Sequence, residues 1–304
     1  MKSLKSSLKA LNAAIVTIQE THSIKKGKIK LEGFEIFEAI HKKSKRGTMI
    51  AVHKALKPVL IHEYSEDFEI IVVECKLGGK EVRIITGYGP QENLVECDRI
   101  PFFLALEEEI NKAEMEGKSI VIQMDDNSKL GKDLIKMDPH DQSPNGKLFA
   151  NIINRHNLLI LNGLESKCSR SITRRRVTKE SVEESIIDFV LISDDLEQEC
   201  ESLVIDQNRD FALGYITKTK TGIKKKESDH NPMITKFKFE WNKKVRKNRI
   251  ESFNLRNKDC QMKFKQATSN TTILSSIFDK SKDLNNATKK NAQKQERQEE
   301  QGRT

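Results

Sequence analysis

The chain has 304 residues, of which 36% are hydrophobic and 33% are charged, and its formal net charge is +9. This composition supplies enough apolar side chains for a packed core. It excludes a protein that crosses a membrane with helices, because the longest apolar runs contain only a few residues and a spanning helix needs about 18. The first residues also lack the pattern of a secretory signal.

Residues 1–240 are predicted to form one mixed α/β domain. Ser3 is a plausible N-cap for a helix that carries Leu4, Leu8 and Leu11 on one face. Apolar stripes predict a second helix, which contains Phe103, Leu106, Ile110 and Ala113 and ends before Gly117, and a third, which contains Leu148, Ile152 and Ile153. Short β-branched runs predict strands at 15–18, 48–52, 68–73, 82–85, 119–122, 158–161, 186–192 and 233–239.

The predicted strands outnumber the helices and do not alternate strictly with them. This order favours two sheets packed face to face, with helices outside, over a fold built from repeated strand–helix–strand units. A mixed α/β sandwich of this kind fits the length of the domain.

The chain changes character after residue 240. Of the 54 basic and 45 acidic residues, 16 and 7 lie in 241–304, so residues 1–240 hold 38 of each sign and are neutral. We expect 241–284 to be a basic, partly helical linker and 285–304 to be a disordered polar tail. The basic run 243–249 suggests nucleic-acid binding or nuclear import, so an intracellular, nuclear location is expected.

The cysteines are odd in number and widely spaced, and no C-x-x-C pair occurs among them. They are Cys75, Cys97, Cys168, Cys200 and Cys260. This pattern indicates neither a disulfide framework nor a structural zinc site. We expect reduced thiols and no disulfide-linked partner.

Polar side chains collect where the predicted strands end. Glu20 follows the strand 15–18 and is suited to holding a hard divalent cation, although it could instead cap the next turn. Tyr88 lies in the sharp turn Gly87–Pro90, where its hydroxyl could donate to a phosphate oxygen or pack on the sheet edge.

Two acidic positions follow or interrupt later strands. Asp125 and Asn127 come after the strand 119–122, where Asp125 could orient or deprotonate a water and Asn127 could donate to a phosphoryl oxygen. The alternative is a simple Asp/Asn-rich turn. Asp188 lies in the apolar run 186–192 and needs a cation, a histidine or several donors, unless it faces outward.

Asp229 and His230 precede the last predicted strand. Neighbours in sequence usually face different ways, so Asp229 could bind a metal while His230 turns to Asp188. The alternative is ordinary surface polarity. The joint occurrence of all five clusters in this order is stronger evidence for an active site than any one cluster alone.

This ordered set resembles the endonuclease/exonuclease/phosphatase superfamily, in its apurinic/apyrimidinic-like endonuclease branch. The resemblance covers residues 1 to about 240 and rests on Gln19–Thr21, Tyr88–Pro90, Asp125-x-Asn127, Ser185-x-Ile187-Asp188 and Ser228–His230. Longer stretches are similar to endonuclease domains of non-LTR retrotransposons, namely Gly87–Glu92, Asp125–Gly131, Asn145–Leu148 and Thr173–Arg176.

The resemblance implies a four-layered α/β sandwich and a set of roles. Glu20 and Asp229 would hold Mg²⁺ or Mn²⁺, and Asp125 would align or activate the attacking water. The scissile phosphate would be bound by three side chains, Tyr88, Asn127 and His230, and Asp188 would orient His230. The partner would be DNA and the protein a monomer. Two local basic runs would contact DNA phosphates beside the cleft, Arg174, Arg175 and Arg176 in one and Lys224, Lys225 and Lys226 in the other.

The sequence departs from the family pattern in two places. The first strand of the fold, which ends in an Asn, is expected to be missing, with Lys2 nearest to the second metal ligand. Met124 and Asp126 replace a Gly and a bulky apolar residue, and a buried Asp126 would need a partner or a raised pKa. The leading hypothesis is a Mg²⁺-dependent DNA endonuclease that nicks a strand for a mobile element. The alternatives are a truncated or degenerate, inactive retroelement remnant that binds nucleic acid, and a phosphatase of the same superfamily.

Overall fold

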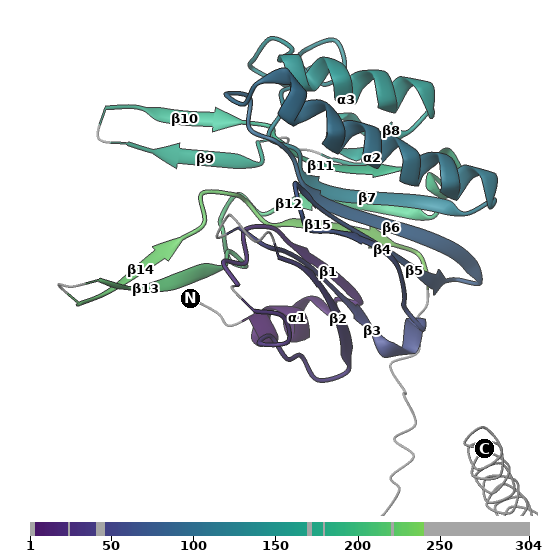
Figure 1. Ribbon diagram of the computed structural model, residues 1–304, viewed down its shortest axis with the longest axis horizontal. Helices are drawn as coiled ribbons and strands as arrows, with labels where there is room; N and C mark the ends of the chain where they lie inside the picture. Colours follow the sequence, from purple (N-terminus) through teal and green to yellow (C-terminus); the bar gives the residue numbers. More distant parts are fainter. Residues whose placement is uncertain are drawn as a thin grey trace, which may run out of the picture. The chain divides into compact units, whose positions relative to one another are not determined.

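Figure 1 shows the computed structural model, which describes residues 4–23, 25–40, 46–168, 172–178, 180–219 and 222–239. These residues belong to one unit, residues 1–245. The predicted linker 241–284, the tail 285–304, the basic run 243–249, Ser3 and Cys260 lie outside the described residues, so their interpretation stays a prediction.

A six-stranded sheet forms the centre of the molecule. Its strand order is β4-β5-β6-β7-β11-β8. The sheet is mixed, because β6 and β7 run parallel while the other neighbours are antiparallel. The strands are β4 (Val59–Tyr64), β5 (Glu69–Leu77), β6 (Lys80–Tyr88), β7 (Ser119–Asp125), β8 (Leu159–Ile160) and β11 (Asp188–Ile192).

A second layer of strands packs on one face of this sheet. It contains the antiparallel sheet β1-β3-β2 and the antiparallel pair β12-β15. Buried side chains of both parts share one core cluster with the six-stranded sheet, for example Ile50, Ile84 and Leu203. The strands are β1 (Ile15–Ile18), β2 (Phe34–Ala39), β3 (Thr48–His53), β12 (Cys200–Ile205) and β15 (Met233–Phe237).

Helices cover both outer faces, which completes the expected four layers. The helices α2 (Glu96–Met115) and α3 (Pro144–Arg155) share a second core cluster with the six-stranded sheet. Ser143 caps α3, since its hydroxyl accepts a hydrogen bond from the Gly146 amide. Helix α1 (Leu4–Leu11) lies beside β1, β2 and β3, away from α2 and α3 (Figure 1). Short 3-10 helices occur at Lys54–Leu56, Leu161–Gly163 and Asp194–Leu196.

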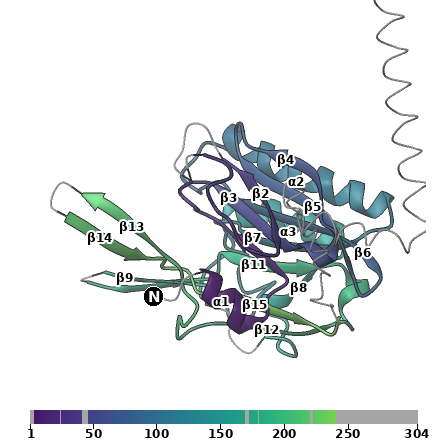
Figure 2. The same ribbon diagram turned by 90° about the horizontal axis from the view of Figure 1, so that it is seen from below.

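Two hairpins project from the body on the same side (Figures 1 and 2). One consists of β9 (Arg174–Val177) and β10 (Val182–Ser185), and the other of β13 (Gly214–Thr219) and β14 (Gly222–Glu227). The sequences of both hairpins contain basic residues. The predicted strands around 15–18, 48–52, 68–73, 82–85 and 119–122 are confirmed, whereas neither hairpin was predicted.

Three predicted strands are shorter in the structure. The run 233–239 forms a strand only at Met233–Phe237. The run 158–161 forms a strand only at Leu159–Ile160, because the chain then enters a 3-10 turn. The run 186–192 begins as a strand at Asp188, because the amides of Ile187 and Asp188 donate to the Thr173 hydroxyl instead of to a neighbouring strand.

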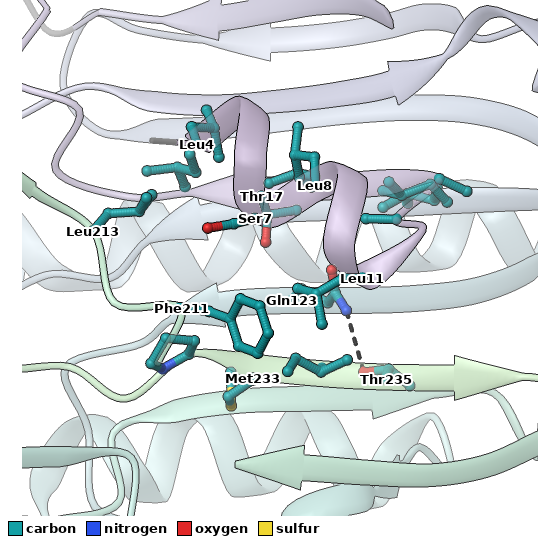
Figure 3. Close-up of a pocket in the computed structure, with 18 of the residues that line it drawn as sticks. Leu4, Ser7, Leu8, Leu11, Thr17, Gln123, Phe211, Leu213, Met233 and Thr235 are labelled. Atoms are coloured by element: carbon teal, nitrogen blue, oxygen red, sulfur yellow. Dashed lines mark hydrogen bonds between the residues drawn. The ribbon is translucent and has the colours of Figure 1, made fainter. Parts of the chain in front are cut away.

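The second layer is divided by a cavity of about 1140 Å³ between β1 and β15. Among the described residues, β1 pairs only with β3 and β15 only with β12, so each of the two strands has one unpaired edge. Figure 3 shows apolar side chains of α1, with Met233 and Phe211, around this space. The floor includes Ile84, Val121 and Gln123 of the six-stranded sheet.

This division predicts uneven hydrogen exchange. Alternate amides of β1 and β15 point away from their single partner and toward the cavity, whereas β5 and β6 are paired on both sides and buried. We expect the cavity-facing amides to exchange at least ~100-fold faster than those of β5. Residue-resolved hydrogen–deuterium exchange would measure this, and equal protection of β1 and β5 would contradict it.

Within the described part of the chain, no helix is long and apolar enough to span a bilayer. No disulfide joins the four described cysteines, Cys75, Cys97, Cys168 and Cys200.

Candidate active site

Strand pairing places three of the predicted site residues in one row. Tyr88 is the partner of Asp125 between the parallel strands β6 and β7, and Asp125 is the partner of Asp188 between β7 and β11. Directly paired residues project from the same face of a sheet. Three residues that lie far apart in sequence therefore stand side by side at one end of the six-stranded sheet.

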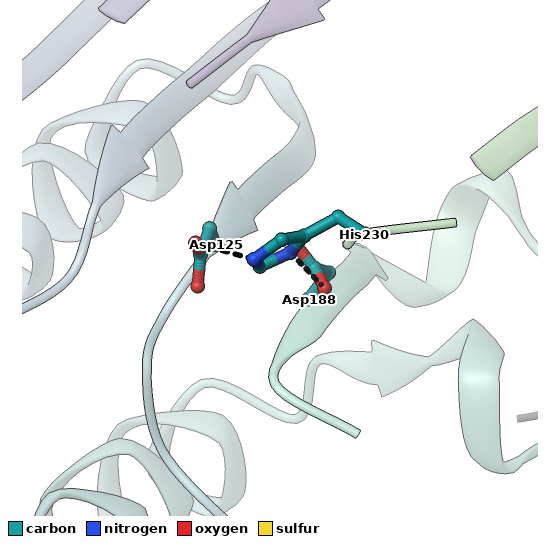
Figure 4. Close-up of side chains that lie close together, drawn as sticks. All are labelled: Asp125, Asp188 and His230. Carbon is teal, nitrogen blue, oxygen red and sulfur yellow. Dashed lines mark hydrogen bonds and ion pairs between the residues drawn. The ribbon is translucent and has the colours of Figure 1, made fainter. Parts of the chain in front are cut away.

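His230 completes this row from the second layer. Its Nδ1 atom lies 2.9 Å from both carboxylate oxygens of Asp188, and its Nε2 atom lies 3.8 Å from Oδ2 of Asp125 (Figure 4). The ligand-type atoms of the three residues all lie within 4.8 Å of one another. The predicted pairing of His230 with Asp188 is therefore present in the structure.

The base of the β9–β10 hairpin fixes both partners of this pair. The Thr173 hydroxyl accepts hydrogen bonds from the amides of Ile187 and Asp188. The Arg175 amide donates to the Asp229 carbonyl, and the Asn231 amide donates to the Thr173 carbonyl. The backbone that leads into Asp188 and the backbone on each side of His230 are thus tied to the same short segment, 173–175.

Burial and charge together perturb the protonation of this cluster. Burial and the nearby Asp188 carboxylate raise the pKa of Asp125 to about 8. Burial alone would lower the pKa of His230, but the carboxylates of Asp188, Asp125 and Asp229 outweigh it and raise this pKa to about 10. His230 is therefore an imidazolium at neutral pH, with one N–H on Asp188 and the other directed toward Asp125.

Glu20 and Tyr88 meet at the β1 side of the row. The Tyr88 hydroxyl donates to Oε1 of Glu20 at 2.9 Å. Burial, with Asp125 and Glu20 nearby, raises the pKa of Tyr88 well above its usual value, so the phenol stays protonated. Glu20 follows β1 with a positive φ of 51°, an uncommon backbone conformation for this residue type.

Asn127 turns the chain directly after Asp125. Its φ is +52°, a conformation that Asn tolerates better than most residues. Its amide donates to Oδ1 of Asp125 at 3.1 Å, and its side chain donates to the Gly89 carbonyl at 3.0 Å. Gly89 has to be a glycine here, because a Cβ atom would collide with the Asp126 backbone. The two predicted turns are therefore packed against each other.

Asp126 lies in the core beneath this turn and is fully buried. It hydrogen-bonds with the Ser128 hydroxyl, while its other oxygen has no partner among the described residues. Burial raises the pKa of Asp126 well above its usual value. The expectation that a buried Asp126 needs a partner or a raised pKa is met on both counts.

Asp229 is engaged by an arginine in this structure. Nε of Arg174 lies 2.9 Å from Oδ2 of Asp229. Burial alone would raise the pKa of Asp229, but Arg174 and His230 hold it below the usual value. Asp229 is therefore ionised, and its contact with the predicted DNA-binding residue Arg174 was not anticipated.

The other predicted DNA contacts lie on the hairpins. Arg175 and Arg176 are exposed on β9, and Arg175 forms an ion pair with Glu184 across the hairpin. Lys224, Lys225 and Lys226 lie on β14 of the second hairpin. In the sequence, Arg46 is the last residue of the basic run 42–46, which was not assigned to DNA contacts beside the cleft. In the structure its guanidinium carbon lies 5.1 Å from the centre of the Tyr88 ring.

Carboxylates outnumber cations around the cavity mouth. Four of them line the cavity beside His230, namely Glu20, Asp125, Asp188 and Asp229. Oxygen-rich, negatively charged surroundings fit Mg²⁺ or Mn²⁺. The protonated ring of His230 is unsuited to metal ligation, which leaves the carboxylate oxygens as ligands.

No family model matches this sequence, and no curated protein matches it. Solved structures do match the fold. The catalytic domain of APE2 from Xenopus laevis is 14% identical, with coverage of 79% of this chain and 88% of that chain and a TM-score of 0.57. An endonuclease/exonuclease/phosphatase family protein from Bacteroides thetaiotaomicron is 14% identical, with coverage of 77% and 86% and a TM-score of 0.50.

The chain has the endonuclease/exonuclease/phosphatase fold. A third match is the endonuclease domain of TRAS1, a telomere-specific non-LTR retrotransposon, at 16% identity, with coverage of 78% of this chain and 93% of that chain and a TM-score of 0.51. In this fold the row formed by Tyr88, Asp125 and Asp188 lies at the strand ends of one sheet, facing His230 from the other layer.

Proposed function

We propose that this chain is a divalent-metal-dependent endonuclease that hydrolyses phosphodiester bonds in DNA. The observation that carries the proposal is the imidazolium of His230, held by Asp188 at 2.9 Å and directed at Asp125 from 3.8 Å. A fixed cation beside a carboxylate of raised pKa provides both a donor for phosphoryl oxygens and an acceptor for a water proton.

The proposed roles follow from the positions of the atoms. Nε2–H of His230 donates to a phosphoryl oxygen as negative charge develops on it, while Nδ1–H stays on Asp188. Asp125, once ionised, accepts a proton from the attacking water. Tyr88 and Asn127 line the same end of the sheet and would contact the phosphate after giving up part of their contacts to Glu20 and Gly89.

Glu20 and Asp229 are the proposed metal ligands, as the resemblance implied. A bound Mg²⁺ or Mn²⁺ would supply positive charge at the phosphoryl oxygens. Glu20 has one oxygen on the Tyr88 hydroxyl and is otherwise exposed, so it can accept a cation without losing its orientation. Asp229 is already ionised, but it would have to share its carboxylate with Arg174.

DNA is the proposed substrate because two basic hairpins project on one side of the body. A role in strand nicking for retrotransposition is supported by the fold shared with the TRAS1 endonuclease domain. An inactive nucleic-acid-binding remnant is the second candidate. The cavity in the second layer and the Arg174–Asp229 contact favour it, since both alter the metal side of the site.

A plasmid-nicking assay separates these candidates. Wild-type protein with Mg²⁺ is expected to convert supercoiled plasmid to the open circular form, and EDTA is expected to stop the conversion. Release of phosphate from a 3′-phosphorylated oligonucleotide would test a phosphatase activity in parallel. DNA binding without nicking in Mg²⁺ or Mn²⁺ would reject the endonuclease proposal and support the remnant.

The nicking rate is expected to depend on pH in a bell shape. Asp125 has to be ionised to accept a proton, so the rate should rise through about pH 8. His230 has to stay protonated, so the rate should fall as pH rises through about 10. Bound metal favours the ionised carboxylate, so raising Mg²⁺ should move the rising limb to lower pH. A flat profile between pH 6 and 11 would contradict these roles.

A further inference from the structure

Two arginines stand at opposite ends of the row of site residues. Arg46 precedes β3 and stacks over the Tyr88 ring at the β6 end, where Tyr88 also contacts Glu20. Arg174 begins β9 and contacts Asp229 at the β11 end, where Asp188 holds His230. The acidic cluster lies between them.

The row has the size of a short stretch of nucleic-acid backbone. Its members stand on three neighbouring strands, β6, β7 and β11, whose spacing of about 4.8 Å makes the row about 10 Å wide. An arginine beyond each end of the row can therefore reach a phosphate on either side of one held at Asp125.

Both guanidinium groups keep donors for such a contact. The Tyr88 ring is uncharged, so it attracts Arg46 without neutralising it, and no carboxylate of the described residues pairs with Arg46. Arg174 uses Nε for Asp229 and leaves its terminal nitrogens for a second acceptor. Asp229 thereby fixes the plane of the Arg174 guanidinium.

We infer that Arg46 and Arg174 bind the two backbone phosphates that flank the scissile one. The inference rests on the proposed function and narrows it: the preferred substrate is a nucleic-acid strand that continues on both sides of the cleaved bond. A terminal phosphate or a small phosphodiester would occupy only the centre of the row and would gain nothing from one or both arginines.

Kinetics on two substrates test the assignment. A 30-base-pair duplex provides flanking phosphates, whereas bis(p-nitrophenyl) phosphate provides none. Arg46→Gln and Arg174→Gln are each expected to lower kcat/KM on the duplex about tenfold. On the small diester, each variant should change kcat/KM much less. Arg174→Lys keeps the positive charge next to Asp229, so it should retain part of the kcat/KM on the duplex that Arg174→Gln loses. Arg155→Gln is the control, because Arg155 is exposed on α3 and pairs with Glu107.

DNA binding measured in EDTA provides a readout that does not need catalysis. Fluorescence anisotropy of a labelled duplex is recorded across salt concentrations, and each variant should reduce the slope of log K against log salt by about 0.9. Thermal melting of each variant checks that the fold is kept. Equal losses on the two substrates, or an unchanged salt slope, would overturn the inference. A wild-type protein that cleaves neither substrate rejects the proposed function, while the salt slope still decides the inference.

Discussion

Replacing His230 by alanine is expected to lower the nicking rate about 1000-fold, the largest effect predicted for a single side chain. The variant removes the imidazolium whose pKa of about 10 keeps a positive charge beside the reacting phosphate. It also leaves the carboxylates of Asp188 and Asp125 without the cation that lies between them. The rate of open-circle formation under saturating Mg²⁺ measures the effect.

His62→Ala is the matched control for this variant. His62 lies on β4 and contacts the buried Glu109, outside the active site, so the nicking rate should stay within about twofold of wild type. His230→Gln keeps a neutral hydrogen-bond donor but no charge, and it should recover little of the loss. Equal nicking by wild type and His230→Ala would remove His230 from the proposed chemistry.

Replacing Asp125 by asparagine should abolish most activity and yet stabilise the fold. The variant lacks the proposed proton acceptor, so nicking should fall about 100- to 1000-fold. The folded pKa of Asp125, about 8, lies above its usual value of 3.8. The folded state therefore disfavours the ionised form, and wild-type stability should decline as pH rises from about 4 to 8.

The asparagine variant is free of this decline. We expect it to exceed wild type by roughly 2 kcal/mol in unfolding free energy at pH 8.5, and by much less at pH 5. Thermal melts at the two pH values measure the difference. Asp195→Asn provides a control, since Asp195 has a lowered pKa despite its partial burial and contacts Ser119, Ser193 and Lys80 outside the site. A variant less stable than wild type at pH 8.5 would refute the argument.

The sequence predicted the part of the site that depends on strand ends. Asp125 was recognised because it follows a predicted strand, and Asp188 because a carboxylate inside an apolar strand is costly unless it has a partner. His230 was recognised because it neighbours Asp229 in sequence and could turn to Asp188. The many short apolar runs predicted two packed sheets with helices outside, and the family resemblance implied the four layers. Strands buried on both faces, such as β5, give the strongest signal because they contain a continuous apolar run, here Ile70–Val73.

The remaining features depend on contacts that no local pattern contains. Strand β4 was missed because its residues Val59, Leu60 and Ile61 are exposed at the sheet edge, where apolar side chains give no periodic signal. Strand β2 was missed because Glu35 and Glu38 interrupt its apolar residues. The contacts of Arg174 with Asp229 and of Arg46 with Tyr88 join residues more than 40 positions apart. Because arginine side chains are long and can reach many partners, the sequence does not determine which contact each one makes.

The single hydroxyl of Thr173 links the projecting arm to the catalytic pair. It anchors the amides that precede and begin β11, and the same segment holds the backbone of 229–231. A load applied to the tip of β9–β10, such as a bent duplex pressing on it, would therefore act on Asp188 and His230 together. Because Asp188 on β11 is the direct partner of Asp125 on β7, the six-stranded sheet would resist any change in the spacing of the three side chains.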